Sequence, residues 1–260
     1  MPSGGSPDCR WERFSEGIRK MENLKSAEYT RVLLKLSGEA LAGAQRFGID
    51  SLRLSWIAEQ IKTAVDLKVG MALMVGGGNF FRGGRESWGV SDRVSVDYLG
   101  MLATVMNSVA LQQELAKLGI ITRVLSAINV PQICEPFIRP RALHHLERDR
   151  VVILAAGTGN PFFTTDTAAT LRALELGCQV FLKATRVKGV YDSDPEKNPK
   201  AKFYQTLSYT KALSKDLKVM DATALSLCRD HKLPIIVFNF FEEGNLRKAL
   251  LGRTVGTLIK

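Results

Sequence analysis

Residues 151–170 limit what this chain can fold into more than any other stretch. They open with the continuous apolar run Val151 to Leu154, which is typical of a strand buried on both faces of a parallel sheet. Gly157 and Gly159 then let the backbone turn sharply and approach a ligand closely. The Thr-Thr-Asp sequence at 164–166 predicts a helix start, whose free N–H groups and positive dipole suit a phosphate. Taken alone, the segment fits an ordinary capped helix equally well.

Two further strands end in the same manner. The run at 32–36 is apolar apart from Lys35 near its end and is followed by Ser-Gly. The run at 71–75 ends in three glycines, with Arg82 beyond them. Because Lys and Arg supply positive charge and glycine loops supply backbone N–H donors, the three strand ends are predicted to converge on a phosphate site. The alternative is an edge-strand lysine and a solvated loop arginine.

Apolar runs and helical patterns alternate along the chain. Strands are predicted at 31–37, 70–75, 121–126, 151–155, 179–184, 234–238 and 255–259. Helices are predicted at 51–67, 94–118, 139–147, 165–176 and 219–231. This alternation predicts an α/β fold, a three-layer αβα sandwich with a largely parallel central sheet and with ligands at the carboxyl ends of its strands. The polar, turn-rich loop at 188–202 either covers a nucleotide base or is a surface β-hairpin.

The composition provides ample core material, since 45% of the 260 residues are hydrophobic. We assign residues 29–260 to one domain and residues 1–28 to a polar N-terminal extension, expected to be disordered or to precede a start at Met21. No uninterrupted apolar run approaches the roughly 18 residues of a membrane span, and the four cysteines form neither a zinc nor a disulfide pattern. A soluble protein of the reducing cytoplasm is therefore expected.

The net charge of +10 belongs to the predicted domain. Residues 1–28 add nothing to it, because they hold five basic and five acidic residues. A basic domain attracts phosphorylated substrates or polyanions. No compact Lys/Arg stripe interleaved with aromatic residues occurs in the sequence, so nucleic-acid binding is disfavoured.

Known nucleotide signatures narrow the phosphate chemistry. The sequence has no Gly-Lys pair for a P-loop, no Gly-x-Gly-x-x-Gly dinucleotide motif, and neither the Asp-Phe-Gly nor the His-Arg-Asp triplet of protein kinases. Phosphoryl transfer needs positioning and positive charge more than a nucleophilic side chain. Lys35 and Arg82 can supply that charge, the glycines at 76–78 and 157–159 can supply N–H donors, and Asp166 can orient the cations or Mg²⁺.

Five stretches together resemble the bacterial-type UMP kinases (uridylate kinases) of the amino acid kinase superfamily, over about residues 30–260. They are Leu-Leu-Lys-Leu-Ser-Gly-Glu-Ala-Leu from 33, Gly-Gly-Gly-Asn-Phe-Phe-Arg-Gly from 76, Met-Leu-Ala-Thr-Val-Met-Asn from 101, Gly-Thr-Gly-Asn-Pro-Phe-Phe-Thr-Thr-Asp from 157 and Leu-Lys-Val-Met-Asp from 217. Other members of the superfamily share the lysine-glycine opening and the glycine loop. The stretch from 157 resembles the UMP-binding segment in particular.

The resemblance implies transfer of the γ-phosphate of ATP to UMP with Mg²⁺ as cofactor, and we assign the catalytic role to Lys35, Arg82 and Asp166. The positions that match ATP contacts are Lys35, Leu36, Ser37, Gly38, Gly78, Arg82, Thr185, Tyr191 and Asp194. The positions that match UMP contacts are Gly77, Asp97, Thr158, Gly159, Asn160, Pro161, Phe162, Phe163, Thr164 and Thr165. A carboxylate such as Asp97 can accept two hydrogen bonds from ribose hydroxyls. CMP is expected to be rejected, because its amino group replaces the O4 acceptor of UMP.

The resemblance also implies a homohexamer that GTP activates and UTP inhibits. The effector loop falls at Gly43 to Gly48 and includes Arg46, while Arg123 and Arg150 are further candidates for effector binding. Two alternatives stay open. In the first, the chain is another kinase of the superfamily that acts on a carboxylate. In the second, it is a nucleotide-sensing regulator that binds UTP or nucleic acid without turnover.

Overall fold

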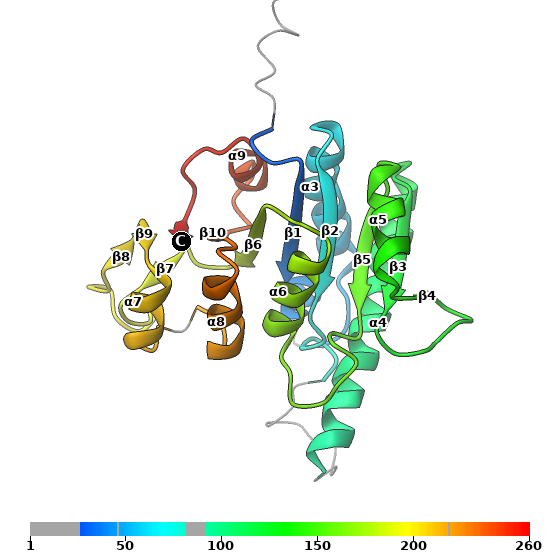
Figure 1. The fold of residues 1–260 in the computed structure, drawn as a ribbon, viewed down its shortest axis with the longest axis horizontal. Coiled ribbons are helices and arrows are strands. Elements are labelled where there is room, and N and C mark those ends of the chain that lie inside the picture. Colours follow the sequence, from blue (N-terminus) through cyan, green and yellow to red (C-terminus); the bar gives the residue numbers. More distant parts are fainter. Residues whose placement is uncertain (1–26, 46, 82–91, 218) are drawn as a thin grey trace, which may run out of the picture.

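The computed structural model describes residues 27–45, 47–81, 92–217 and 219–260, so only the last two residues of the predicted extension at 1–28 are among them. Within these ranges, a nine-stranded sheet forms the centre, and its strands pair in parallel except for β10 with β11 (Figure 1). In spatial order the strands are β4 (Glu135–Pro136), β3 (Thr122–Ser126), β5 (Val151–Ala155), β2 (Gly70–Val75), β1 (Arg31–Leu36), β6 (Val180–Thr185), β10 (Ile235–Asn239), β11 (Thr257–Ile259) and β9 (Thr206–Leu207). The predicted α/β fold with a largely parallel sheet is confirmed.

Helices cover both faces of this sheet and complete three layers. One face carries α2 (Glu39–Ala42), α3 (Ser51–Asp66), α4 (Arg93–Lys117) and α9 (Asn245–Leu250), and the other carries α5 (Arg139–Glu147), α6 (Thr165–Glu175), α7 (Tyr209–Ser214) and α8 (Ala222–Asp230). Successive side chains of a strand point to opposite faces, so Leu33 of β1 packs into the core beneath α6 while Leu34 packs into the core beneath α3.

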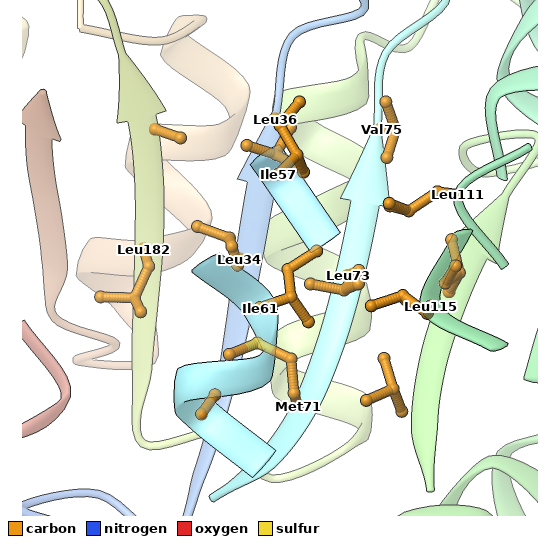
Figure 2. Packing of buried hydrophobic residues seen from close by; sticks show 14 of the residues in the cluster. Leu34, Leu36, Ile57, Ile61, Met71, Leu73, Val75, Leu111, Leu115 and Leu182 are labelled. Atoms are coloured by element: carbon orange, nitrogen blue, oxygen red, sulfur yellow. The ribbon is translucent and has the colours of Figure 1, made fainter. Parts of the chain in front are cut away.

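The core beneath α3 fixes the central strands side by side. Figure 2 shows Ile57 and Ile61 of α3 lying over Leu34 of β1 and Leu73 of β2. All four side chains are fully buried. Ile57 and Ile61 are four residues apart and therefore share one face of the helix. Burial of each such side chain contributes about 1.5–3 kcal/mol, which holds β1 and β2 in the places that bring their loops together.

The three predicted strand ends meet at one edge of the sheet. Strands β5, β2 and β1 are consecutive and parallel, so their carboxyl ends lie at the same edge. The loops after β1 and β2 touch directly: a Cβ added to Gly38 would lie 2.5 Å from the carbonyl oxygen of Gly76 and 2.6 Å from the amide nitrogen of Gly78. Only glycine fits at this approach, and the predicted convergence of the strand ends is confirmed.

The predicted elements agree with the structure to within three residues at each end. The helices and strands that the sequence did not predict are all short. Helices α2, α7 and α9 and strands β4, β8 and β9 span two to six residues each, too few to show a full hydrophobic period. The loop predicted at 188–202 begins with β7 (Val190–Tyr191), which pairs antiparallel with β8 (Phe203–Tyr204). The interpretation of this segment as a β-hairpin is therefore confirmed.

Helix α4 is unusually apolar for a helix of this length. By length and composition it is long and apolar enough to cross a membrane, although the sequence contains no uninterrupted apolar run of that size. One face of the helix packs on the sheet, which is the arrangement of a core helix. On its other face, large hydrophobic side chains are exposed at every fourth position. They are Val94, Tyr98, Leu102 and Met106.

The close packing at the start of β11 predicts an asymmetry between two glycines. Gly256 (φ +64°) and Gly119 (φ +73°) are both in the left-handed region, where a side chain costs roughly 1–2 kcal/mol. A Cβ at Gly256 would also overlap the carbonyl oxygen of Val237, whereas a Cβ at Gly119 would meet nothing within 4 Å. We expect Gly256→Ala to lower the free energy of unfolding by about 1–3 kcal/mol more than Gly119→Ala, because overpacking adds to the backbone cost. Urea denaturation measures both, and equal losses would contradict this packing.

Candidate active site

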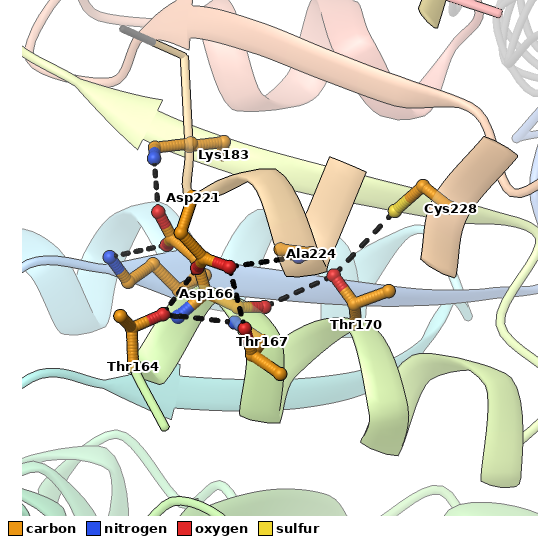
Figure 3. A network of polar contacts seen from close by, with 9 residues as sticks. Thr164, Asp166, Thr167, Thr170, Lys183, Asp221, Ala224 and Cys228 are labelled. Carbon is orange, nitrogen blue, oxygen red and sulfur yellow. Dashed lines mark hydrogen bonds and ion pairs between the residues drawn. The ribbon is translucent and has the colours of Figure 1, made fainter. Parts of the chain in front are cut away.

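A buried cluster of three charged side chains lies at the carboxyl edge of the sheet. Asp166, in the first turn of α6, places Oδ1 2.7 Å from Nζ of Lys35 on β1 and Oδ2 2.5 Å from Nζ of Lys183 on β6. Lys35 and Lys183 are register partners on neighbouring strands, where like charges repel. The carboxylate of Asp166 contacts both ammonium groups and compensates this repulsion; Figure 3 shows its contact with Lys183. With both lysines protonated, the cluster keeps one net positive charge.

The electrostatics of the cluster keep its carboxylate ionised. Burial favours the neutral form of Asp166, but the two adjacent ammonium groups outweigh burial and lower the pKa of Asp166 below its usual range. Burial lowers the pKa of Lys183, although Asp166 opposes this shift; the charge of Lys35 acts in the same direction as burial. The sequence predicted Lys35 and Asp166 as site residues and missed Lys183. The sequence feature that could have revealed Lys183 is a lysine in the middle of an apolar run, in strand Val180–Thr185.

Asp221 joins the first turns of two helices beside this cluster (Figure 3). It is the N-cap of α8, where Oδ1 accepts the N–H of Ala224 at 2.9 Å. The same carboxylate accepts hydrogen bonds from the hydroxyls of Thr164, which caps α6, and of Thr167 at 2.8 Å. In the sequence, Asp221 is only the last residue of the Leu-Lys-Val-Met-Asp stretch, and no role was predicted for it. The structure shows that it fixes the start of α6 and, with it, the position of Asp166.

A first cavity, of about 140 Å³, opens where the loop after β2, helix α4 and the loop after β5 meet. It brings together most of the residues predicted to contact UMP. Those lining it are Gly77, Asp97, Thr158, Asn160, Phe163 and Thr165.

The other four residues predicted to contact UMP do not line this cavity, and three of them have other contacts. Gly159 (φ +79°) approaches the carbonyl oxygen of Ala127 so closely that a Cβ would lie 2.8 Å from it. Phe162 is 68% exposed, and its N–H donates to Oδ2 of Asp97 at 2.7 Å. Thr164 is engaged as the helix cap, and Pro161 lies in the turn before it. Within the described structure these residues shape the loop around the cavity.

A second cavity, of about 580 Å³, lies beside the β7–β8 hairpin. Thr185, Tyr191 and Asp194, all predicted to surround ATP, line it together with Lys183. The hairpin therefore also forms a cavity wall, so the two interpretations of this segment are compatible. Thr165 borders the first cavity and Lys183 borders the second, which places the cluster around Asp166 between the two. The two cavities draw on separate stretches of chain, one up to residue 165 and the other from residue 183 onward.

Two cavities with a buried cluster of charged side chains between them, at the carboxyl edge of a largely parallel sheet, agree with the matches to known proteins. The model of the amino acid kinase family matches residues 30–239. The chain belongs to the amino acid kinase family.

Three solved structures show which members of the family the chain resembles. It is similar to the crystal structure of UMP kinase from Bacillus anthracis, with 44% identity, a TM-score of 0.86, and coverage of 89% of this chain and 96% of that one. It is also similar to UMP kinase from Ureaplasma parvum (36% identity, TM-score 0.84, covering 89% and 98%). A third is uridylate kinase from Archaeoglobus fulgidus (28% identity, TM-score 0.68, covering 88% and 99%). The resemblance to bacterial-type UMP kinases is confirmed.

Among the described residues, the remaining family positions predicted to contact ATP lie at the ends of β1 and β2. The side chain of Leu36 is fully buried in the core, so only its backbone can face a ligand. Ser37 is exposed, and Gly38 packs against the glycine loop. Gly78 borders the first cavity and is not among the residues lining the second. Arg82 lies outside the described residues, and its assignment stays a prediction.

The residues predicted to bind effectors fall into two separate regions. Gly43 and Gly48 belong to the loop after α2, and Gly48 exchanges two hydrogen bonds with Asn79 beside the glycine loop, at 3.0 Å and 2.9 Å. Arg46 lies outside the described residues. Arg123 and Arg150 belong to another cluster at β3 and α5.

The second region is built around Glu135. Nε of Arg123 lies 3.8 Å from Oε1 of Glu135, whose Oε2 lies 3.3 Å from Nε2 of His145. Nδ1 of His145 in turn lies 3.1 Å from Nη1 of Arg150. The sequence did not predict that the two arginines would share a cluster, because the chain between them gives no sign of their common neighbours.

The described residues give Mg²⁺ no set of ligands in this family site. Within those ranges, no group of three or more His, Cys, Asp or Glu side chains is close enough to hold a metal. Both oxygens of Asp166 face ammonium groups.

Replacement of the central carboxylate predicts a pH-dependent loss of stability. We expect Asp166→Asn to lower the free energy of unfolding by about 3–5 kcal/mol at pH 7, because it leaves two buried lysines without their counter-charge. The pKa of folded Asp166 lies below the unfolded value of about 3.9. The stabilisation is therefore fully present above about pH 5 and is lost as the pH falls through the folded-state pKa.

Urea denaturation from pH 8 to pH 2.5 measures this difference, which should stay constant down to about pH 5 and shrink below about pH 4. The matched control is Asp66→Asn, which removes an exposed carboxylate paired with Lys62 on α3. Its effect should be much smaller at every pH. A difference for Asp166→Asn that grows on acidification would refute the ionised state assigned to this carboxylate.

Proposed function

We propose that the protein transfers the γ-phosphoryl group of ATP to UMP, giving UDP and ADP. The observation that carries this proposal is the buried cationic cluster between two cavities, in a chain similar to UMP kinases over nearly its whole described length. The cavity beside α4 is the proposed UMP side. The cavity beside the β7–β8 hairpin is the proposed ATP side.

The reaction asks little covalent chemistry of the protein. A phosphate oxygen of UMP attacks the γ-phosphorus of ATP, one oxygen–phosphorus bond forms, and the bond from the γ-phosphorus to the departing ADP oxygen breaks. Because the attacking oxygen is already anionic, no general base has to remove a proton. This agrees with Asp166, whose oxygens face two ammonium groups and which serves to hold cations.

Positive charge and fixed dipoles supply the catalysis in this proposal. Lys35 and Lys183 lie where charge develops on the transferred group, and both are positioned before substrate arrives by their contacts with Asp166. The first turn of α6 and the glycine loop at 76–78 add backbone dipoles that need no reorganisation. Arg82 is proposed to contact ATP phosphates as well. MgATP is the proposed donor substrate, with the metal brought by the nucleotide.

Regulation and assembly extend the proposal. GTP is proposed to activate and UTP to inhibit, through the Gly43 to Gly48 loop and the cluster of Arg123 and Arg150. The two hydrogen bonds between Gly48 and Asn79 support a role for the Gly43 to Gly48 loop, because they join it to the glycine loop at 76–78. A homohexamer in the cytoplasm is proposed. Its support is the row of exposed apolar side chains on α4, at Val94, Tyr98, Leu102 and Met106, because a row spaced four residues apart lies along one side of the helix and suits association with another copy.

An ADP-release assay tests the function. ATP and Mg²⁺ are offered with UMP, CMP, AMP or GMP, and the UMP reaction is repeated with GTP or UTP. Turnover confined to UMP is expected. Preference for a carboxylate such as glutamate, aspartate or carbamate would favour another kinase of the family, and salt-dependent DNA binding by a protein inert toward ATP and UMP would favour a regulator.

Loss of the strand lysine is expected to cost catalysis more than folding. Lys35→Ala should lower kcat about 100- to 1,000-fold, the size of losing a preorganised charge at a developing anion. Folding should survive, because Asp166 keeps Lys183 at 2.5 Å. Steady-state kinetics and a thermal melt measure the two effects, with Lys62→Ala on the exposed face of α3 as the control. A variant with a near-normal rate would make Lys35 a structural residue.

Replacement of Asp97, on α4, is expected to weaken UMP binding more than it slows turnover. Asp97→Asn should raise KM for UMP roughly tenfold and lower kcat less, because it removes mainly ground-state binding to the ribose. Asparagine retains one oxygen that can accept the N–H of Phe162, so the loop geometry is preserved. Initial rates over a range of UMP concentrations measure this, with exposed Asp230→Asn as the control. An unchanged KM would remove Asp97 from the UMP site.

A further inference from the structure

The middle of helix α4 carries polar side chains where a core helix is normally apolar. Thr104 is 3% exposed, and Asn107 and Ser108 are fully buried. Burial of a polar group is costly unless its hydrogen bonds are made, so each of these residues must have partners. Ser108 donates to the carbonyl of Thr104 within its own helix, at 2.7 Å. Thr104 and Asn107 instead reach out of the helix to two different loops.

Thr104 holds the loop after β5. Its Oγ1 accepts the N–H of Ala156 at 2.7 Å and donates to the carbonyl oxygen of Met101 at 2.6 Å. Ala156 is fully buried and has φ +61°, a left-handed conformation that is unfavourable for a residue other than glycine. Such a conformation persists only where its surroundings hold it. Thr104 therefore fixes the first residue of the loop that lines the proposed UMP side.

Asn107 holds the loop after β2. Its Nδ2 donates to the carbonyl oxygen of Gly76 at 2.8 Å and to Oδ1 of Asn79 at 2.7 Å, while its Oδ1 accepts from Nδ2 of Asn79 at 2.9 Å. The reciprocal pair of amides is buried, with Asn79 only 1% exposed. Both ends of the glycine loop are thus tied to one side chain of α4.

The helix also touches the glycines between these ends. A Cβ added to Gly77 would lie 2.6 Å from the carbonyl oxygen of Gly100 and 2.9 Å from Cβ of Ala103. Thr104 and Asn107 are three residues apart and lie on the same side of α4, one turn along the helix. The separation between the two loops is therefore set by one turn of a rigid helix.

We propose that Thr104 and Asn107 are positioning residues that fix the spacing of the two glycine loops across the first cavity, and with it the alignment of the acceptor phosphate for transfer. The proposal rests on the proposed kinase function. Thr104 borders the first cavity, but its hydroxyl is engaged with the N–H of Ala156 and the carbonyl oxygen of Met101, so in this proposal it acts through Ala156. Asn107 acts through Gly76 and Asn79. A misplacement of about 1 Å in a reacting group costs roughly 100-fold in rate, so small shifts of either loop are measurable.

Kinetics of matched variants test the proposal. Thr104→Val, which keeps the shape and removes the hydroxyl, should lower kcat/KM for UMP about tenfold or more, chiefly through kcat. Thr104→Ser should restore the rate to within about threefold, since it returns the hydroxyl. The control Ser108→Ala deletes a buried hydroxyl bonded only within the helix and should leave the rate unchanged. An equal loss in Ser108→Ala, or a normal rate in Thr104→Val, would overturn the proposal.

The amide pair is tested by combining variants. Asn107→Ala and Asn79→Ala should each lower kcat/KM, and the double variant should lose less than the product of the two losses, because both break the amide pair. The contacts that only one of them makes, Asn107 with Gly76 and Asn79 with Gly48, leave the remaining difference. Independent, multiplying losses would contradict a shared role.

Amide hydrogen exchange separates the positioning claim from the kinase claim. Exchange at residues 157–159 should be faster in Thr104→Val, and exchange at residues 76–79 faster in Asn107→Ala, than in wild type or Ser108→Ala. If wild type fails to phosphorylate UMP, the kinase function is wrong, while the exchange contrast still decides whether α4 positions these loops. Exchange equal in all variants would overturn the positioning role.

Discussion

One buried carboxylate determines how the central elements of this protein fit together. Lys35 and Lys183 occupy matching positions on β1 and β6, and pairing of their strands in this register is costly unless an anion lies between them. Asp166 supplies that anion from the first turn of α6. The position of α6 is in turn fixed by Asp221, which caps α8 and binds Thr164. Asp166 therefore both stabilises the packing of α6 on β1 and β6 and holds the two lysine side chains in place before any ligand binds.

Much of the fold was predictable because its strands are buried on both faces. The runs at 70–75 and 151–155 are almost entirely apolar, and their strands appear where the pattern predicts them. Short elements such as α7 and α9 were not predictable, since six residues show too little periodicity and their formation depends on neighbours far along the chain. The order of strands in the sheet likewise depends on tertiary packing.

The site was predictable in part, and the missing residues share a physical reason. Lys35 and Asp166 stand next to glycine or threonine signals that mark strand and helix ends. Lys183 lies inside an apolar strand, and only its alignment with Lys35 reveals its partner. Thr104 and Asn107 lie in the middle of a helix whose composition is that of a core element. Local sequence identifies residues at the ends of elements, whereas residues that act through long-range contacts need the folded chain.

The separation of the two cavities along the chain has a consequence for how such an enzyme can change. One side of the site is formed from residues up to 165, and the other from residue 183 onward, with the charged cluster joining them. A segment exchange that replaces 186–217 alters one cavity and leaves the walls of the other intact. Recognition on the two sides can therefore diverge independently among descendants of one ancestor, or be recombined in chimeras, while the shared cluster is inherited unchanged.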